Sequence, residues 1–254
     1  MKKKILIGIA VFVFWIAVWQ GLSMLVNKEV LLPAPFSVVK RLFGLIRTSG
    51  FHKTVLLSCI RIFGGFLIAF FSGCIFGVIC AKIKIIDLFL SPVISTIKAT
   101  PVASFIILTL VWIDKQTAPL FISFLMVFPI IFSNVKEGIN STDKKLLEMA
   151  RVFEFPKSRI LTKIYFPSLI PYLTAGLKAS LGIAWKSGVA AEVICQPSFS
   201  IGKFLYESKL NLETVDLFAW TVAVILISII IEKAVIFILN TATKKSKRKA
   251  ADHK

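Results

Sequence analysis

The sequence predicts an all-α integral membrane protein, and three observations support this. Of the 254 residues, 57% are hydrophobic, only 17% are charged, and the mean hydropathy is +0.85. Soluble chains are closer to half apolar and a quarter charged. Most basic residues punctuate long apolar runs, so the net charge of +18 does not indicate nucleic-acid binding. The composition excludes a soluble enzyme, a secreted disulfide scaffold and a disordered chain.

Six segments are long and apolar enough to cross a membrane as helices, which takes about 20 residues each. They are residues 5–26, 55–81, 88–112, 117–135, 171–195 and 214–239. Three lysines precede the first, but it is too long for a signal-peptide core and has no small-x-small cleavage site, so we retain it as a span. The third contains Pro92 and Pro101, and we expect its helix to be interrupted.

The distribution of Lys and Arg predicts the orientation. With the N-terminus inside, the inner segments hold 18 basic residues and the outer segments hold 8. The inner segments are 1–4, 82–87, 136–170 and 240–254. Because basic residues favour the cytoplasmic side, both termini are expected to be cytoplasmic. In the basic tail 240–254, the run 244–249 is expected to contact anionic lipid of the inner leaflet.

One outer segment departs from this charge rule. Residues 36–50 follow Pro33 and Pro35 and interleave three basic side chains with apolar ones at near-helical spacing. This pattern predicts an amphipathic helix lying on the outer membrane surface.

Residues that commonly act in catalysis, metal binding or nucleotide binding are scarce in this sequence. The four cysteines lie inside or beside apolar runs without a CxxC pair, and the two histidines, His52 and His253, lie outside the spans. A phosphate-binding G-x-x-x-x-G-K-[ST] loop is also missing from the sequence. We therefore expect no catalytic residue, no metal site and no cofactor in this chain, and an intramembrane enzyme is disfavoured.

The inner segment 136–170 is too long for a turn. Asp143 and its neighbours offer helix-capping oxygens before a helix over 144–153. Pro156 predicts a turn, and a second short helix follows over 158–166 before two further prolines lead into the fifth span. The segment is therefore expected to form a helix-turn-helix that projects into the cytoplasm.

At these residues the chain resembles the EAA loop of bacterial ABC importer permeases. The family pattern is E-A-A, three residues, G, nine residues and I-x-L-P, and its spacing is matched throughout. The coupling positions implied by this resemblance are Glu148, Met149, Ala150, Arg151, Glu154, Ile164, Phe166 and Pro167. Met149, Glu154 and Phe166 replace the family's Ala, Gly and Leu. The missing Gly is the main departure, because in the family it relaxes the turn between the two helices.

The resemblance extends over nearly the whole chain. The matching motifs are Leu32-Pro33-Ala34-Pro35, Ser58-x-x-Arg61-x-x-x-Gly65-Phe66, Pro101 with Trp112, Phe128-Pro129, and Ala184-Trp185 followed by Ala191-Glu192. They are similar to the subgroup that imports nitrate, sulfonates, taurine, bicarbonate or thiamine precursors. The resemblance implies a permease subunit of the bacterial cell membrane. It would act as a dimer, with two cytoplasmic ATPases that bind ATP-Mg and an external solute-binding protein.

Ionised side chains at mid-membrane cost about 2.5–3.5 kcal/mol on insertion scales, so each indicates a role. Candidates for the translocation path, or for a buried ion pair, are Arg61, Lys98, Thr100, Trp185, Lys186 and Glu192. Glu192 is the one carboxylate placed deep in a span, and it could pair with Arg61 or with Lys186.

The sequence thus predicts the membrane-spanning subunit of an ATP-driven importer for a small solute. The alternative is a secondary transporter driven by an ion gradient. Such a transporter needs ion-coordinating groups near the midplane of the membrane, and Glu192 is the only suitable carboxylate that the sequence places there. That alternative also leaves the segment 136–170 unexplained.

Overall fold

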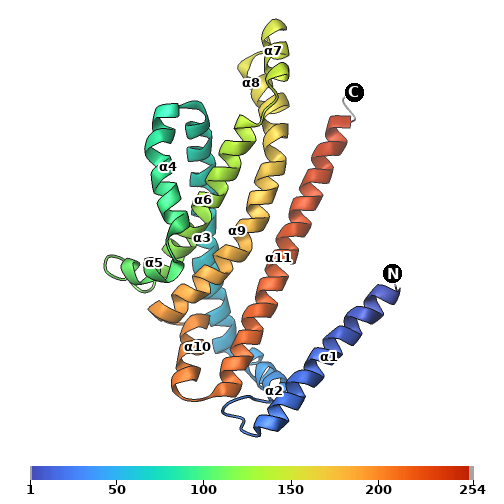
Figure 1. Ribbon diagram of the computed structural model, residues 1–254, viewed down its shortest axis with the longest axis vertical. Helices are drawn as coiled ribbons and strands as arrows, with labels where there is room; N and C mark the ends of the chain where they lie inside the picture. Colours follow the sequence, from blue (N-terminus) through green and yellow to red (C-terminus); the bar gives the residue numbers. More distant parts are fainter. Residues whose placement is uncertain (1, 252–254) are drawn as a thin grey trace.

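The computed structural model describes residues 2–251, with side chains described for 6–238 and Thr241, and it consists of helices (Figure 1). In chain order they are α1 (Lys2–Val26), α2 (Pro35–Ile46), α3 (Ser49–Lys82), α4 (Lys84–Ala99), α5 (Val102–Thr109), α6 (Ala118–Asn140), α7 (Lys144–Val152), α8 (Lys157–Ile160), the π-helix η1 (Leu161–Tyr165), α9 (Phe166–Cys195), α10 (Ile201–Leu210) and α11 (Thr214–Ala251). No strand occurs within residues 2–251, so the predicted all-α class is confirmed. The side chains of the predicted lipid-binding tail, 244–249, lie outside this description.

Four helices in the described residues are long and apolar enough to cross a membrane, namely α1, α3, α6 and α11. Helices α4 and α5 together make a fifth such segment, bent by 104° between Ala99 and Val102. Pro101 causes the predicted interruption, because it starts α5 and cannot continue α4. The sixth predicted span, α9, is 30 residues long but falls short of the same apolarity criterion, and it carries Lys178, Lys186 and Glu192.

The core of the bundle is the packing of α3 against α6 and of α6 against α9. Small residues at four-residue spacing on α3, including Gly65 and Gly73, are buried at the α3–α6 contact. A Cβ atom on Gly65 would lie only 2.1 Å from the carbonyl oxygen of Leu120. The small-residue pattern therefore serves close helix packing within one chain.

Helix α1 leans away from the bundle (Figure 1), and none of its membrane-length window is buried. Its C-terminal end is held by two hydrogen bonds. The Trp19 Nε1 atom donates to the Pro33 carbonyl oxygen at 3.1 Å, and the Ser23 hydroxyl donates to that of Leu32 at 3.0 Å. The remainder of α1 presents apolar side chains outward, as suits a helix in lipid or against another chain.

The predicted amphipathic helix is present as α2, with Val38 and Leu42 buried. It ends at Ile46 rather than at residue 50, because Thr48 caps the next helix and its hydroxyl accepts a hydrogen bond from the Phe51 backbone N–H. Helices α7 and α8 lie at the opposite end of the molecule from α2 and α10 (Figure 1). Helix α10 is an addition to the prediction, which treated 196–213 as an outer segment without structure.

Candidate functional site

The first candidate site is the projecting helix-turn-helix, α7 with the turn that follows it. Asp143 starts α7, and its carboxylate accepts a hydrogen bond from the Lys145 backbone N–H at 2.9 Å. The end of α7 is closed by two backbone bonds, Glu154 N–H to the Arg151 carbonyl at 3.1 Å and Phe155 N–H to the Ala150 carbonyl at 2.8 Å. This bond pair is a Schellman motif, in which the residue after the C-cap adopts left-handed geometry.

Glu154 is that left-handed residue, with φ of 50°. It occupies the position where the EAA pattern has Gly. Left-handed geometry costs a residue with a Cβ atom roughly 1–2 kcal/mol, which glycine avoids. The turn therefore forms without the glycine, and Glu154 carries the strain.

The second half of the predicted helix-turn-helix differs from expectation. A separate helix over 158–166, ended by Pro167, is not present. Instead α8 passes through the π-helix η1 into α9 without a break, and the Phe166 N–H bonds to the Leu161 carbonyl five residues back. Pro167 lies in the first turn of α9, where a missing N–H is tolerated, and Pro171 lies within the helix.

The eight predicted coupling residues divide by burial. Ala150 and Ile164 are buried, so they support the shape of the site, and the others are exposed or nearly so. Large apolar side chains on α7 and its turn also face outward, with Val152 79% exposed and Phe153 67% exposed. Apolar side chains gathered on a projecting tip, beside the exposed carboxylate of Glu148, are typical of a protein–protein contact.

The second candidate site surrounds Glu192 near the other end of the bundle. Its side chain is completely buried, and Oε2 accepts hydrogen bonds from the Ser58 hydroxyl at 2.8 Å and the Gly202 N–H at 3.2 Å. The Ser58 oxygen in turn accepts the Ile201 N–H at 3.0 Å. Side chains from α3 and α9 therefore satisfy the free N–H groups at the start of α10.

Arg61 completes this network. One guanidinium nitrogen, Nη1, lies 3.7 Å from Glu192 Oε1. The other, Nη2, donates to Gln116 Oε1 and to the Ser198 carbonyl, both at 2.9 Å. Of the two pairings left open by the sequence, the structure contains the one with Arg61. The resulting network, defined by Ser58, Arg61 and Glu192, joins α3 and α9 to the segment that leads into α10.

Lys98 lies in the last turn of α4, and Thr100 follows directly after that helix. The Lys98 ammonium donates to the Ser133 hydroxyl on α6 at 2.7 Å. Thr100 ends α4, and its hydroxyl donates to the Thr96 carbonyl at 2.8 Å. Both therefore act at the bend between α4 and α5, and their role in the path remains a prediction.

Trp185 and Lys186 are neighbours on α9 with opposite environments. The Trp185 ring is buried, and its Nε1 atom donates to the Val224 carbonyl of α11 at 3.2 Å, so it joins two helices. The Lys186 side chain is exposed, and within the described part of the chain it has neither a salt bridge nor a hydrogen bond. Lys186 thus remains the candidate on α9 that could meet a solute.

Comparison with known proteins identifies this architecture. Residues 73–249 match the family described as "Binding-protein-dependent transport system inner membrane component". A putative aliphatic sulfonates transport permease of Bacillus subtilis (strain 168) is 30% identical over 207 residues, covering 80% of this chain and 74% of that protein. A nitrate import permease of Synechococcus elongatus is 31% identical over 206 residues, covering 76% and 73%.

Two further similarities agree with these. A bicarbonate transport system permease of Synechococcus elongatus is 26% identical, covering 80% of this chain and 77% of that one. A solved structure titled as an amino acid ABC transporter with histidines has a TM-score of 0.57 at 19% identity, covering 83% of this chain and 97% of that one. At that identity the structure supports the fold alone.

These matches favour an ABC importer permease over the secondary transporter, and they identify a multi-pass membrane protein from a family of transport subunits rather than enzymes. They also indicate that this chain works together with ATPase and binding-protein partners. The chain belongs to the inner-membrane permease family of binding-protein-dependent ABC importers, as its EAA-type segment and whole-chain motifs predicted.

Proposed function

We propose that two copies of this chain form the translocation path of an importer for a small anionic solute. Two cytoplasmic ATPases, each with ATP-Mg, would hydrolyse ATP, and an external binding protein would deliver the solute. ATP would close the ATPase pair and move α7 of each copy, rocking the two permease halves between inward-open and outward-open forms. Glu148, Ala150 and the turn at Glu154 would transmit that movement.

The observation that carries this proposal is the exposed apolar tip of α7. Val152 and Phe153 lie at the end of the bundle, and their side chains are mostly exposed in the described part of the chain. Apolar side chains exposed in this way are costly in water but stabilise a complex when a partner surface buries them. An ATPase cleft is the partner implied by family membership.

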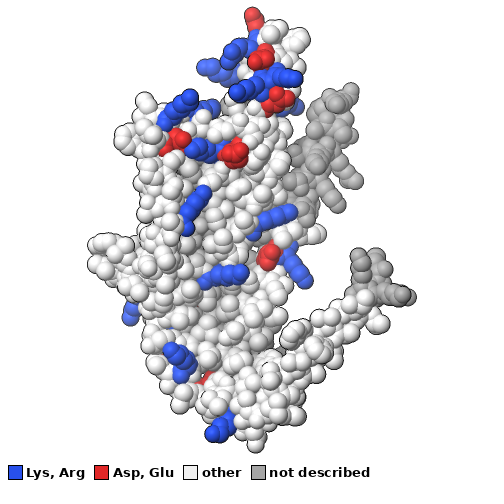
Figure 2. All heavy atoms as spheres, in the orientation of Figure 1, with Lys and Arg blue, Asp and Glu red and all other residues white. Residues whose placement is uncertain are grey.

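The solute class rests on two kinds of support. The relatives described above are named for sulfonates, nitrate and bicarbonate, which are all anions. In this chain, basic side chains outnumber acidic ones along the apolar middle of the face in view in Figure 2. Exposed cations at membrane depth favour a path that attracts anions.

The orientation follows the basic-residue excess. With α7 in the cytoplasm, α2 and α10 face outward, and both termini lie inside. The basic tail would then rest on the anionic inner leaflet, which stabilises this orientation.

Affinity purification of the tagged chain from its native membranes, followed by intact-complex mass and ATPase measurements, tests the proposal. A complex of two permease chains and two ATPase chains is expected. Val152→Asp should lose the ATPase chains, whereas Leu212→Asp, a change of another strongly exposed apolar residue at the opposite end, should keep them. A lone chain or a homodimer without ATPase would contradict the proposal. Undiminished uptake in ATP-depleted cells with an intact proton gradient would instead support the secondary transporter.

A further inference from the structure

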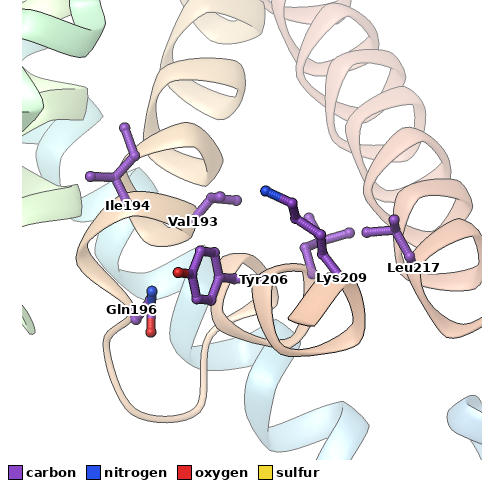
Figure 3. Close-up of a pocket in the computed structure, with 7 residues that line it drawn as sticks. Val193, Ile194, Gln196, Tyr206, Lys209 and Leu217 are labelled. Atoms are coloured by element: carbon purple, nitrogen blue, oxygen red, sulfur yellow. The ribbon is translucent and has the colours of Figure 1, made fainter. Parts of the chain in front are cut away.

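A cleft of about 580 Å³ lies where α9 ends, between α9, α10 and the start of α11. Figure 3 shows Lys209 reaching from α10 toward α9, with Tyr206 between it and Gln196. The other lining side chains are apolar, among them Val193 and Leu217. The cleft therefore has an apolar wall and three polar side chains, as small-molecule sites generally do.

The three polar side chains can all donate hydrogen bonds, and one carries a positive charge. Within residues 6–238, the structure gives no hydrogen bond or salt bridge to the side chains of Gln196, Tyr206 or Lys209. No carboxylate lines the cleft. The Lys209 ammonium can only donate, and Gln196 and Tyr206 can donate beside it, so the cleft suits an anion.

A neighbouring cleft at the same end of the molecule is lined mainly by acidic charged side chains, in contrast to the Lys209 cleft. That cleft, of about 330 Å³, is lined by Glu207, Glu213 and Asp216 with Arg41. Arg41 already binds Asp216 through Nη2 at 2.6 Å, so its charge is neutralised. Positive charge is therefore not spread evenly over this end, and an anion would be directed to the Lys209 cleft.

Lys186 lies further along α9 on the same side as a residue that lines the cleft. Lys186 and Val193 are seven residues apart, so they lie on the same side of the helix. Gly182 and Ala179 extend this face toward the cytoplasmic end with small side chains. The face links the cleft to a second exposed cation, Lys186, at membrane depth.

We propose that the cleft of Gln196, Tyr206 and Lys209 is an outer binding site for the anionic group of the transported solute, with Lys209 as the charged contact. The solute would enter here and pass along the Lys186 face of α9. This inference rests on the proposed function for its solute. The same cleft could hold the phosphate of an outer-leaflet phospholipid, which offers the same chemistry, so the test must separate the two sources.

The test uses a thiol reporter in the cleft, Leu217→Cys, in a full-length chain whose four native cysteines are replaced by alanine. In phosphatidylcholine nanodiscs, the reaction rates of an anionic and a cationic methanethiosulfonate reagent are compared. With Lys209 present the anionic reagent should be favoured, and Lys209→Gln should lower the anionic-to-cationic rate ratio by about tenfold. Lys209→Arg should preserve the ratio.

Lys203→Gln is the matched control, because Lys203 lies on the same helix but is paired with Glu207 at 3.4 Å outside the cleft. It should leave the ratio unchanged. Millimolar nitrate, bicarbonate or methanesulfonate should slow the labelling of the reporter when Lys209 is present and have no effect in Lys209→Gln.

A second measurement needs no substitution, so it tests the proposal even if the cysteine-free chain fails to fold. Acetylation of the native chain, read by peptide mass, should be slowed by the same anions at Lys209 and not at Lys203. An unreactive reporter, a ratio insensitive to Lys209→Gln, or protection by phosphatidylglycerol but by none of the free anions would overturn the proposal. These readouts involve no ATPase, so they fail or succeed separately from the proposed complex.

Discussion

The two ends of this molecule treat polar and apolar groups in opposite ways. At the α7 end, apolar Val152 and Phe153 face outward and Glu154 holds a strained left-handed turn. At the α10 end, the carboxylate of Glu192 is fully buried and faces Ser58 and Arg61 of α3 and the Gly202 N–H of α10. The apolar side chains at the α7 tip are therefore exposed, whereas the Glu192 carboxylate is enclosed by groups of the chain itself.

On the proposed function, this difference separates the α7 tip, which would dock a partner, from the Glu192 network, which stabilises the fold. A buried carboxylate is tolerated only when charge and hydrogen-bond partners compensate its lost hydration. Glu192 has both, and it fixes the start of α10 beside the bundle. Side chains at the α7 tip contribute little to the fold, because few of them contact the rest of the chain. Substitutions at the two ends should therefore have different consequences.

The largest expected effect is on coupling, from Glu148→Lys at the α7 end. Glu148 is exposed and makes no salt bridge in the described part of the chain, so thermal stability should change by no more than about 0.5 kcal/mol. Reversing a charge in a docked interface costs on the order of 2 kcal/mol or more. ATPase activity stimulated by the loaded binding protein should fall to the unstimulated level, measured in reconstituted vesicles.

Lys84→Glu is the control for this prediction, because Lys84 is another exposed charge at the same end but on α4. It should retain stimulated ATPase activity. If Glu148→Lys retains it as well, α7 does not couple the permease to the ATPase.

The next largest effect is on stability, from Glu192→Leu at the α10 end. This change leaves the Ser58 hydroxyl and the Gly202 N–H without their acceptor and Arg61 without its ion-pair partner. Breaking a buried ion pair by removing one partner costs about 3–5 kcal/mol. Thermal unfolding in detergent should show a loss of this size, with proteolysis first appearing between α9 and α10.

Glu207→Gln provides the comparison for Glu192. Its salt bridge with Lys203 is exposed, and such pairs contribute at most about 1 kcal/mol. A loss of similar size in both variants would show that burial does not distinguish these two carboxylates.

Sequence reasoning was successful where the signal is local. Five of the six predicted spans follow from apolar runs, α7 follows from its cap, and the turn after it follows from Pro156. Helix α10 was missed because two of the acceptors at its start come from other helices, Ser58 from α3 and Glu192 from α9. The local clues were Ser200, whose hydroxyl accepts the Lys203 N–H, and the i,i+4 pair of Lys203 and Glu207.

Two other features could not be predicted from local sequence patterns. Prolines near the start of α9 predicted a break, but the wide turn of η1 carries the helix past Pro167. The residues of the Lys209 cleft all lie within 193–217, but the cleft forms only where the end of α9, α10 and the start of α11 come together. Predicting the cleft therefore requires the arrangement of these three helices.

The smallest effect is expected from Glu154→Gly, and it tests the origin of the strain at the α7 end. Glycine restores the family residue at φ of 50°, where the cost of a Cβ atom disappears. Stability should rise by about 1 kcal/mol, measured by thermal unfolding, with stimulated ATPase activity retained. Glu154→Ala keeps the Cβ atom and removes the carboxylate, so it should gain nothing. Equal gains in both variants would show that the destabilisation comes from the Glu154 carboxylate and not from its left-handed backbone.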